Sequence, residues 1–195
     1  MKPLRALLFM FAALWLSAGV AAATLNVAGV KLEDSVEMQG RKLQLNGAGV
    51  RYKFIVKVYV AGLYLSQPAR STSEVMDAPG PKRMSITMLR DIDANELGKL
   101  FTRGVEDNIA KGSLSRLIPG LLRMGQIFSD HKKLLAGDSF QIDWLPGVGT
   151  VITVQGKVQG EPFKEPEFFN AMMGIWLGKS PADWQLKDAL LGSQK

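Results

Sequence analysis

The chain has 195 residues, of which 24 are Lys or Arg and 18 are Asp or Glu, giving a formal net charge of +6. The basic residues are scattered among acidic ones in runs of at most two, a distribution that indicates no nucleic-acid partner. Because the sequence has no cysteine and a single histidine, His131, it excludes disulfides, a structural zinc site and a cysteine–histidine nucleophile, and we predict neither a metal nor a cofactor.

Residues 1–23 have the pattern of a secretory signal peptide. A basic start is followed by an apolar run from Ala6 to about Val20, and then by three alanines. The run is shorter than the roughly 20 residues that span a bilayer, although an uncleaved anchor is the alternative. We predict that cleavage leaves one domain, residues 24–195, without a stable membrane anchor, either periplasmic or secreted.

The first part of the predicted domain has strand patterns. Residues 24–32 and 41–47 are short, alternate between apolar and polar positions, and are bounded by glycine. In residues 51–64 the even positions are mostly apolar, which predicts one unbroken, half-buried strand. A breaker-rich stretch at 66–83 predicts a mobile loop with a short helix. Residues 82–90 predict a further strand with three apolar residues on one face: Met84, Ile86 and Met88.

The middle of the chain has helical periodicity. Residues 94–112 predict a helix capped by Asp93 or Asn95. Residues 113–138 continue helically, with Pro119 marking a start or a break and Gly137-Asp138 the end. In the first of these helices, residues that recur every three or four positions share one face: Leu97, Phe101, Val105 and Asn108.

Strands and then helices return after residue 138. Two strands flank a hairpin signal, a short strand follows, and two helices end the chain, each closed by glycine: residues 139–145, 150–156, 157–163, 165–178 and 180–192. This order of elements indicates an α+β domain in which helices pack against one face of an antiparallel sheet.

Few polar side chains suggest a site. Trp176 and Trp184 lie among apolar helical residues and are expected in the core, and His131 lies in a charged stretch and is expected in solvent. Arg51 differs, because it lies between a glycine-rich turn and an apolar strand. An arginine at the edge of an apolar cavity presents a planar fork of donors to a carboxylate or a polarised carbonyl. The alternative is an ordinary surface residue.

The stretch around Arg51 resembles the chalcone isomerase family. Family members have a G-x-G-x-R turn followed by a K-(V/F)-(Y/T)-x-x-G-x-Y-(L/V) strand, and this chain has Gly47, Gly49 and Arg51 followed by KVYVAGLYL at 57–65. FTRGVEDNI at 101–109 is similar to the family's middle helix, and FFNAMMGIWLG with the ending after it looks like its C-terminal helices. The resemblance is strongest to the bacterial, exported branch. It implies an open-faced β-sandwich, with a large antiparallel sheet, helices layered over one face and a ligand cleft between them.

The plant enzyme of this family closes a chalcone into a flavanone, and the resemblance allows its site to be compared with this chain. Arg51 matches an arginine that stabilises developing negative charge, and Asn108 matches an asparagine at the hydroxyl end. Phe101 stands at the catalytic tyrosine and Ile175 at a threonine, so both positions lack the hydroxyl. Tyr59 stands where the enzyme has another threonine. Arg51 with Tyr59 looks instead like the family's fatty-acid-binding members, in which Arg and Tyr hold a carboxylate at the end of an apolar tunnel.

One distance argues against a site shared by these two residues. Arg51 and Tyr59 are eight positions apart in the sequence, which corresponds to roughly 26 Å along an unbroken strand. They can contact one ligand only if the chain bends or pairs back between them. The intervening YKFIVK at 52–57 contains no turn signal.

Three functions are compatible with these residues. The first, which we favour, is an exported protein that binds a small apolar carboxylate such as a fatty acid, without plant-type chalcone cyclisation. The second is an isomerase or intramolecular lyase acting on an unsaturated carbonyl compound, and the third is a non-catalytic interaction protein of the envelope. The sequence does not identify the ligand, the protein partners or the oligomeric state. The candidate catalytic residues are Arg51, Tyr59 and Asn108. The candidate ligand-binding residues are Arg51, which would be the anion anchor, Tyr59, Phe101, Asn108 and Ile175. Leu97 and Met172 are expected around an apolar tail.

Overall fold

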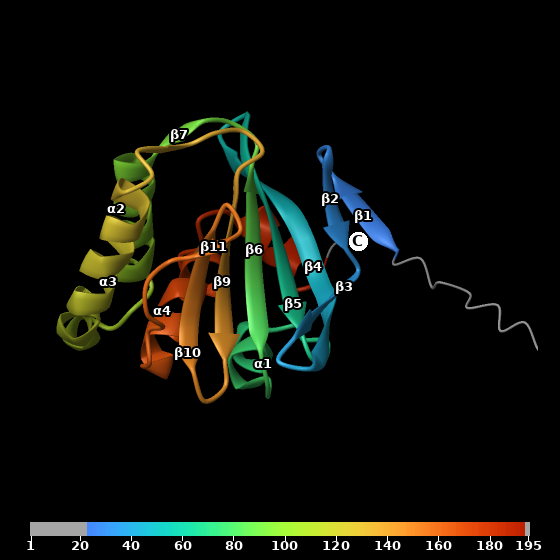
Figure 1. The fold of residues 1–195 in the computed structure, drawn as a ribbon. Coiled ribbons are helices and arrows are strands. Elements are labelled where there is room, and N and C mark those ends of the chain that lie inside the picture. Colours follow the sequence, from blue (N-terminus) through green and yellow to red (C-terminus); the bar gives the residue numbers. More distant parts are fainter. Residues whose placement is uncertain (1–22, 194–195) are drawn as a thin grey trace, which may run out of the picture.

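A seven-stranded sheet forms the centre of the molecule (Figure 1), in the order β11-β10-β9-β6-β5-β4-β3 with every neighbouring pair antiparallel. The computed structural model describes residues 23–193, so the predicted signal peptide, apart from its last residue, lies outside the described residues. The strands of the sheet are β3 (Ser35–Met38), β4 (Arg41–Lys53), β5 (Val56–Leu65), β6 (Lys82–Met88), β9 (Ser139–Leu145), β10 (Gly149–Val154) and β11 (Lys157–Val158).

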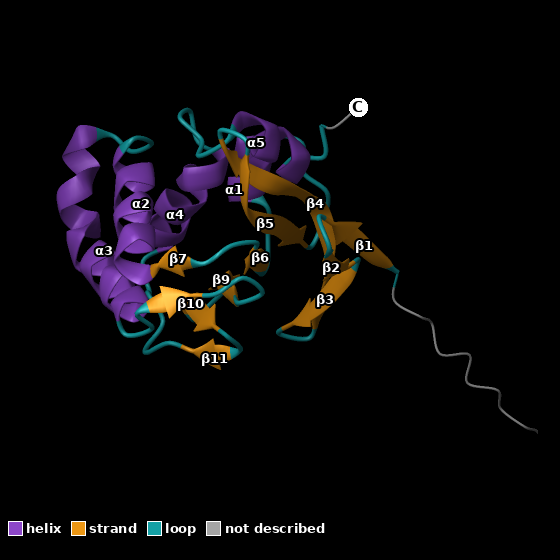
Figure 2. Cartoon of the chain, turned by 90° about the horizontal axis from the view of Figure 1, so that it is seen from above, coloured by secondary structure: helices purple, strands orange, loops and turns teal. Residues whose placement is uncertain are grey.

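The helices lie on one side of this sheet, as the view from above in Figure 2 shows. Two small strand pairs accompany it, β1 (Thr24–Val27) with β2 (Val30–Glu33) and β7 (Ile92–Asp93) with β8 (Lys133–Leu134). The predicted α+β architecture, a large antiparallel sheet with helices over one face, is therefore confirmed. The helices are α1 (Thr72–Asp77), α2 (Ala94–Glu106), α3 (Leu114–Ser129), α4 (Pro166–Leu177) and α5 (Trp184–Leu190). Helix α1 is the short helix predicted within 66–83, and a 3₁₀ turn at Lys111–Ser113 precedes α3.

Four aromatic rings join the helices to the sheet in the core. The Phe101 ring of α2 has its centroid 5.2 Å from that of Phe128 on α3, 5.7 Å from that of Phe140 on β9 and 6.0 Å from that of Trp176 on α4. All four side chains are at most 5% exposed. Such ring pairs add stacking and edge-to-face attraction to the free energy of burying large apolar surfaces. The cluster fixes α2, α3 and α4 relative to one another and to the sheet.

The chain reverses direction inside the segment that was predicted to be one unbroken strand. Residues 51–64 are the end of β4, a two-residue connection at Phe54 and Ile55, and most of β5, with Lys53 paired to Val56. The prediction was wrong because the turn contains none of the residues that usually mark one. Phe54 instead adopts the left-handed region at φ +58°, where a glycine or asparagine is favoured.

Both predicted middle helices end earlier than the sequence suggested. Asp93 is the N-cap of α2, accepting hydrogen bonds from the backbone N–H groups of Asn95 (2.9 Å) and Glu96 (3.1 Å). Pro119 lies inside α3 and neither starts nor breaks it, because the carbonyl of Ser115 that loses its donor is on an exposed residue and can bond water. After Ser129 the chain leaves the helix and forms β8.

Only one of the two tryptophans that were expected in the core is buried. Trp176 is 1% exposed, as predicted, but Trp184 is 60% exposed. Trp184 is the first residue of α5, and this short helix buries a different face through Leu186, Ala189 and Leu190. The Lys187 ammonium lies 5.2 Å from the centroid of the Trp184 indole ring, so the ring is partly covered by a cation rather than by the core.

Helix α5 packs directly on the backbone of β4 where the sequence reads GAG. A Cβ atom at Gly47 would collide with the backbone carbonyl oxygen of Ala189, and one at Gly49 would lie 2.7 Å from the Ala189 Cβ. The glycines are therefore required by the close approach of the helix, and this approach holds β4 in place just before Arg51.

We predict that Gly47→Ala lowers the free energy of unfolding by about 3 kcal/mol, because rigid backbone atoms must move to admit the methyl group. Gly125→Ala is the matched control, since a Cβ at this position in α3 meets nothing within 4 Å. That change should be neutral or stabilise the protein by up to about 1 kcal/mol through helix propensity. Urea denaturation of the three proteins measures both values, and equal effects of the two substitutions would contradict the packing described here.

Candidate functional site

A hollow of about 260 Å³ lies between the β4–β5 hairpin, helices α2 and α4, and the segment that follows α4. Four of the five residues that the sequence marked as a site line it: Arg51, Tyr59, Phe101 and Ile175. We call this hollow the arginine cleft. Its remaining lining residues are Val58, Ile92, Leu97, Leu100, Arg103, Gly104, Asp107, Ser180, Pro181 and Ala182.

Arg51 and Tyr59 are direct neighbours across the hairpin. They are paired residues in the β4–β5 register, and the Arg51 guanidinium carbon lies 5.7 Å from the centroid of the Tyr59 ring. The long separation expected for an unbroken strand is therefore wrong, because the reversal at residues 54–55 brings the two side chains together. Arg51 is half-buried, and within residues 23–193 its guanidinium forms neither an ion pair nor a hydrogen bond. Its donors are available to an anion.

The hydroxyl of Tyr59 is held by the core. The indole Nε1–H of Trp176 donates a hydrogen bond of 2.8 Å to it, and the Tyr59 side chain is 6% exposed. Burial raises the pKa of Tyr59 from its ordinary 10.0 to about 12, an effect that the positive charge of Arg51 only partly offsets. The phenol therefore keeps its proton at neutral pH. Because its oxygen already accepts from Trp176, it can still donate that proton to a ligand.

The wall of the arginine cleft opposite the hairpin is apolar and rigid. Phe101 belongs to the aromatic cluster, and Ile175 of α4 stands against Gly104 of α2, where an added Cβ would lie 3.1 Å from two Ile175 carbons. Leu97 lines the cleft as expected, whereas Met172 is fully buried and does not. Phe101 and Ile175 bring no hydrogen-bonding group to this wall.

The charges at the rim are mixed. Arg103 and Asp107 form an exposed i,i+4 pair with 3.8 Å between Nε and Oδ2, which contributes little to stability. Asp183 lies close enough to Tyr59 to raise the pKa of the phenol slightly, but its carboxylate is engaged by backbone N–H groups of Tyr52 (2.9 Å) and Leu186 (3.1 Å). Arg51 is thus the cationic group of the cleft whose donors are not engaged within the described residues.

Comparison with known proteins agrees with this fold. The sequence profile described as "Chalcone isomerase-like" matches residues 23–192. The chain belongs to the chalcone isomerase-like family. The family resemblance of the sequence motifs is thereby confirmed. No curated protein matches the sequence significantly.

A solved structure supports the fold assignment independently. The crystal structure of an Arabidopsis thaliana fatty-acid binding protein matches with a TM-score of 0.68 over 85% of this chain and 93% of that chain, at 16% sequence identity. At this identity the likeness shows a shared fold. The chalcone isomerase-like chain is therefore an open-faced sandwich of a curled antiparallel sheet with helices on one side.

Asn108 is placed differently from the other four candidate residues of this family member. Its Nδ2 donates to the carbonyl oxygens of Gly104 and Ser180, each at 2.9 Å, and its Oδ1 accepts from the Ser180 N–H at 2.8 Å. The side chain does not line the arginine cleft. It fastens the end of α2 to the segment after α4, and so positions the rim residues Ser180 and Pro181 rather than contacting a ligand beside Arg51.

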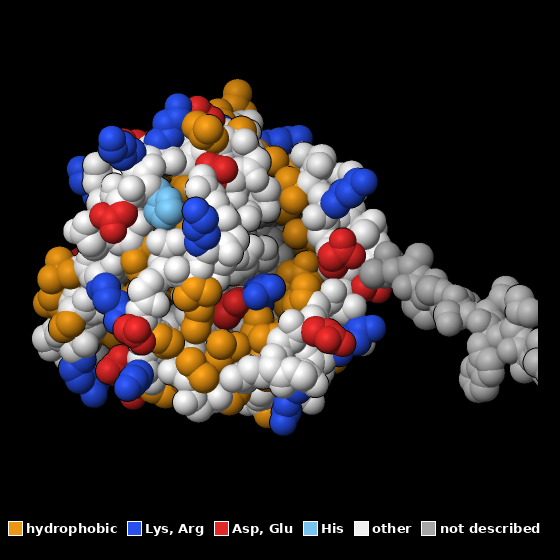
Figure 3. All heavy atoms as spheres, in the orientation of Figure 1, with side chains coloured by type: hydrophobic (Ala, Val, Ile, Leu, Met, Phe, Trp, Pro, Cys, Tyr) orange, Lys and Arg blue, Asp and Glu red, His pale blue; other side chains and the backbone are white. Residues whose placement is uncertain are grey.

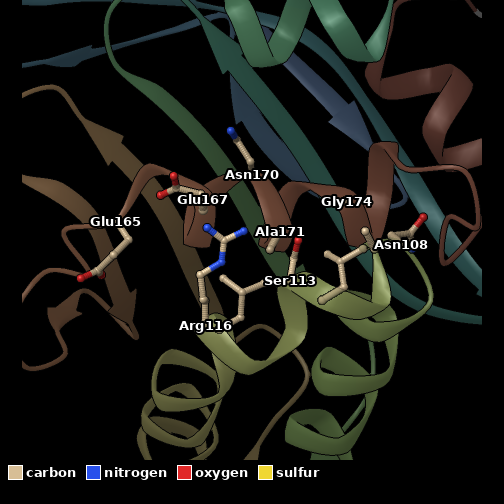
Figure 4. A pocket seen from close by; sticks show the side chains of 11 residues that line it. Asn108, Ser113, Arg116, Glu165, Glu167, Asn170, Ala171 and Gly174 are labelled. Atoms are coloured by element: carbon tan, nitrogen blue, oxygen red, sulfur yellow. The ribbon is translucent and has the colours of Figure 1, made fainter.

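A second cleft of about 510 Å³ lies between the start of α3 and α4, with Asn108 at one end (Figure 4). It has a charged rim formed by Arg116, Glu165 and Glu167 and an apolar floor that includes Leu117 and Ala171. Neither Arg51 nor Tyr59 reaches it. Although it is larger, it has opposite charges on exposed side chains and no buried polar group, so the arginine cleft is the better candidate site.

Sequence reasoning missed three residues that shape the arginine cleft: Trp176, Arg103 and Asp183. Trp176 was assigned to the core, and its contact with Tyr59 spans 117 positions. Asp183 is the N-cap of α5 and had a local signal, since Asp is a preferred cap residue. Within the part of the chain that the structure describes, no group of three or more potential metal ligands occurs, and no helix is both long and apolar enough to cross a membrane.

The raised pKa of Tyr59 predicts an alkaline loss of stability. A phenol that ionises near pH 12 when folded and near pH 10 when unfolded stabilises the protein fully below pH 10, and this contribution falls as the pH rises toward 12. Two pKa units correspond to about 2.7 kcal/mol. Denaturation of wild type and Tyr59→Phe across pH 9–12 should show a smaller alkaline loss in the variant, which keeps the contribution of Tyr64, whose pKa is also raised by burial. Tyr52→Phe, which changes an exposed tyrosine, should follow the wild type, and a parallel decline in all three proteins would refute the assignment.

Proposed function

We propose that the protein binds a small apolar carboxylate, of the fatty-acid type, in the arginine cleft. The observation that carries the proposal is the pairing of Arg51 with Tyr59 at one side of an apolar hollow. The guanidinium supplies a charge and a planar fork of N–H groups that match a carboxylate, and the neutral phenol supplies one further donor. Phe101, Ile175 and Leu97 provide the surface for the tail.

The volume of the cleft indicates the size of the ligand. At about 260 Å³ it falls just below the usual range for small-molecule pockets, which is roughly 300–1,000 Å³. Burial of each methylene stabilises a complex by about 0.8 kcal/mol, or about fourfold in affinity. We expect affinity to rise with chain length over short and medium fatty acids and then to level off once the tail meets Phe101.

Two features favour binding over catalysis. The positions that correspond to hydroxyl-bearing residues of the plant enzyme are Phe101 and Ile175, and Tyr59 keeps its proton and is a poor base. The Arabidopsis protein with the same fold is named as a fatty-acid binding protein, which supports the same class of ligand here. Chalcone cyclisation above the uncatalysed rate would restore the isomerase alternative, in which Arg51 stabilises an enolate-like charge.

The proposal includes a location outside the cytoplasm. Residues 1–23 have the pattern of a signal peptide. N-terminal sequencing of protein from the periplasm or the medium should give a chain that begins at Thr24, and recovery only from the cytoplasm would contradict export.

Titration calorimetry with a series of saturated fatty acids tests the ligand. Arg51→Ala should weaken binding by about 10- to 100-fold, because a charge-assisted hydrogen-bonding pair is lost. Arg51→Lys should bind with intermediate affinity, since the charge remains and the fork is lost. Tyr59→Phe should cost about tenfold, because the phenol is neutral but its acceptor is an ionised carboxylate.

Two controls make the result specific. Arg103→Ala removes a second arginine of the same cleft, one that is 81% exposed and pairs with Asp107, and should change affinity less than about threefold. The methyl ester of the best ligand keeps the tail and lacks the charge, so it should bind as weakly to wild type as the acid binds to Arg51→Ala. Equal affinity of wild type and Arg51→Ala for the acid would overturn the role of Arg51, and no binding of any acid would overturn the proposed function.

A further inference from the structure

The tip of the β4–β5 hairpin exposes an unusual amount of apolar surface. Phe54 is 93% exposed and Ile55 is 92% exposed, with Val56 at 43% and Tyr52 at 36% beside them. Hydrophobic side chains protrude where the upper ends of β4 and β5 lie, at the top of the view in Figure 3. Single exposed apolar residues are common on proteins, but here two almost fully exposed ones are consecutive on a projecting turn.

Folding alone does not account for these residues. Phe54 and Ile55 occupy a two-residue turn and belong to neither hydrophobic cluster of the core. The backbone of Phe54 is left-handed at φ +58°, a conformation that glycine or asparagine adopts with less strain. A bulky aromatic residue at this position lowers the stability of the fold, and its exposed ring makes no packing contacts in the core. Four other non-glycine residues among the described ones also have a positive φ, so what distinguishes the tip is the nearly complete exposure of two bulky apolar side chains.

Cationic side chains stand directly behind the apolar tip. Lys53 precedes Phe54 on β4, and Lys57 faces Tyr52 from β5. Both lysines are exposed, and Lys53 reaches Glu96 only at 4.0 Å between half-exposed groups. The apolar tip has Lys53 one residue before it and Lys57 two residues after it. This arrangement matches the layers of a bilayer surface, where acyl chains lie beneath anionic headgroups and tyrosine favours the boundary.

We propose that this hairpin tip docks on an anionic lipid surface, with Phe54 and Ile55 inserted among the acyl chains and Lys53 and Lys57 at the headgroups. A second copy of the chain fits the tip less well. A stable protein interface buries about 800 Å² on each partner, far more than two projecting side chains offer. A symmetric contact between two tips would also bring the four lysines of the two copies together.

Docking would place the arginine cleft at the membrane. Arg51 and Val58 line the cleft and belong to the same hairpin, three residues before and after the tip. If the cleft takes an apolar carboxylate, such a ligand could pass between bilayer and protein without crossing water. This consequence rests on the proposed function, whereas docking itself does not require a ligand.

The absence of cysteine from the sequence permits a direct test. Ile55→Cys and Leu122→Cys are each labelled with an environment-sensitive fluorophore, Leu122 being 70% exposed on α3. Vesicles of phosphatidylcholine and phosphatidylglycerol, free of fatty acid, should raise the fluorescence severalfold at position 55 and leave position 122 unchanged. Both proteins are prepared as the chain that begins at Thr24, so that the apolar run at residues 6–20 does not itself bind the vesicles. Equal responses at the two positions, or none at position 55, would overturn the proposal.

Unlabelled variants test the same surface by vesicle co-sedimentation. Phe54→Asn with Ile55→Ser places a residue that tolerates the left-handed conformation at position 54. It should reduce partitioning at least tenfold, with a denaturation midpoint equal to or above that of the wild type. Leu122→Ser is the matched control and should bind as wild type does. Lys53→Glu with Lys57→Glu should abolish the preference for anionic over neutral vesicles. Unchanged partitioning of the tip variant would refute docking. A rise in fluorescence at position 55 with protein concentration, in the absence of vesicles, would also refute it, because that result identifies a second copy of the chain as the occupant.

Discussion

The candidate site depends on a strand register that sets Arg51 beside Tyr59. The reversal at residues 54–55 pairs the two residues across β4 and β5, so that a guanidinium and a buried phenol face the same apolar hollow. A shift of one residue would turn Arg51 to the opposite face of the sheet, because side chains alternate along a strand. Trp176 then anchors the phenol through its indole N–H. The result is one positive charge beside one neutral donor, which suits a ligand that brings its own negative charge.

Elements whose structure is decided locally were predictable from the sequence. The alternation of Met84, Ile86 and Met88 sets the buried face of β6, and the Asp93 carboxylate caps α2 through adjacent N–H groups. The hairpin turn at Phe54 and Ile55 was not predictable, because no glycine, asparagine or proline marks it. Pairing of β4 with β5 imposes it, and this pairing is a contact between strands rather than a property of the turn residues.

The site was predictable in part. Arg51, Tyr59, Phe101 and Ile175 were named through the family resemblance, and the fold brings them to one cleft. Asn108 could not be separated from them by sequence, since its partner Ser180 lies 72 positions away and the hydrogen bonds exist only once α2 meets the end of α4. Trp176 and Trp184 had similar apolar neighbours, and only the packing of α4 and α5 distinguishes a buried indole from an exposed one.

Phe101 belongs at once to the wall of the arginine cleft and to the aromatic cluster that joins α2, α3, α4 and β9. Interiors packed to this density deform little, so displacing one ring disturbs its neighbours as well. A tail too long for the hollow would therefore have to loosen the contacts that hold three helices on the sheet. If the proposed function holds, the stability of the fold itself limits the length of the ligand, because a longer tail could enter only by partly unfolding the protein.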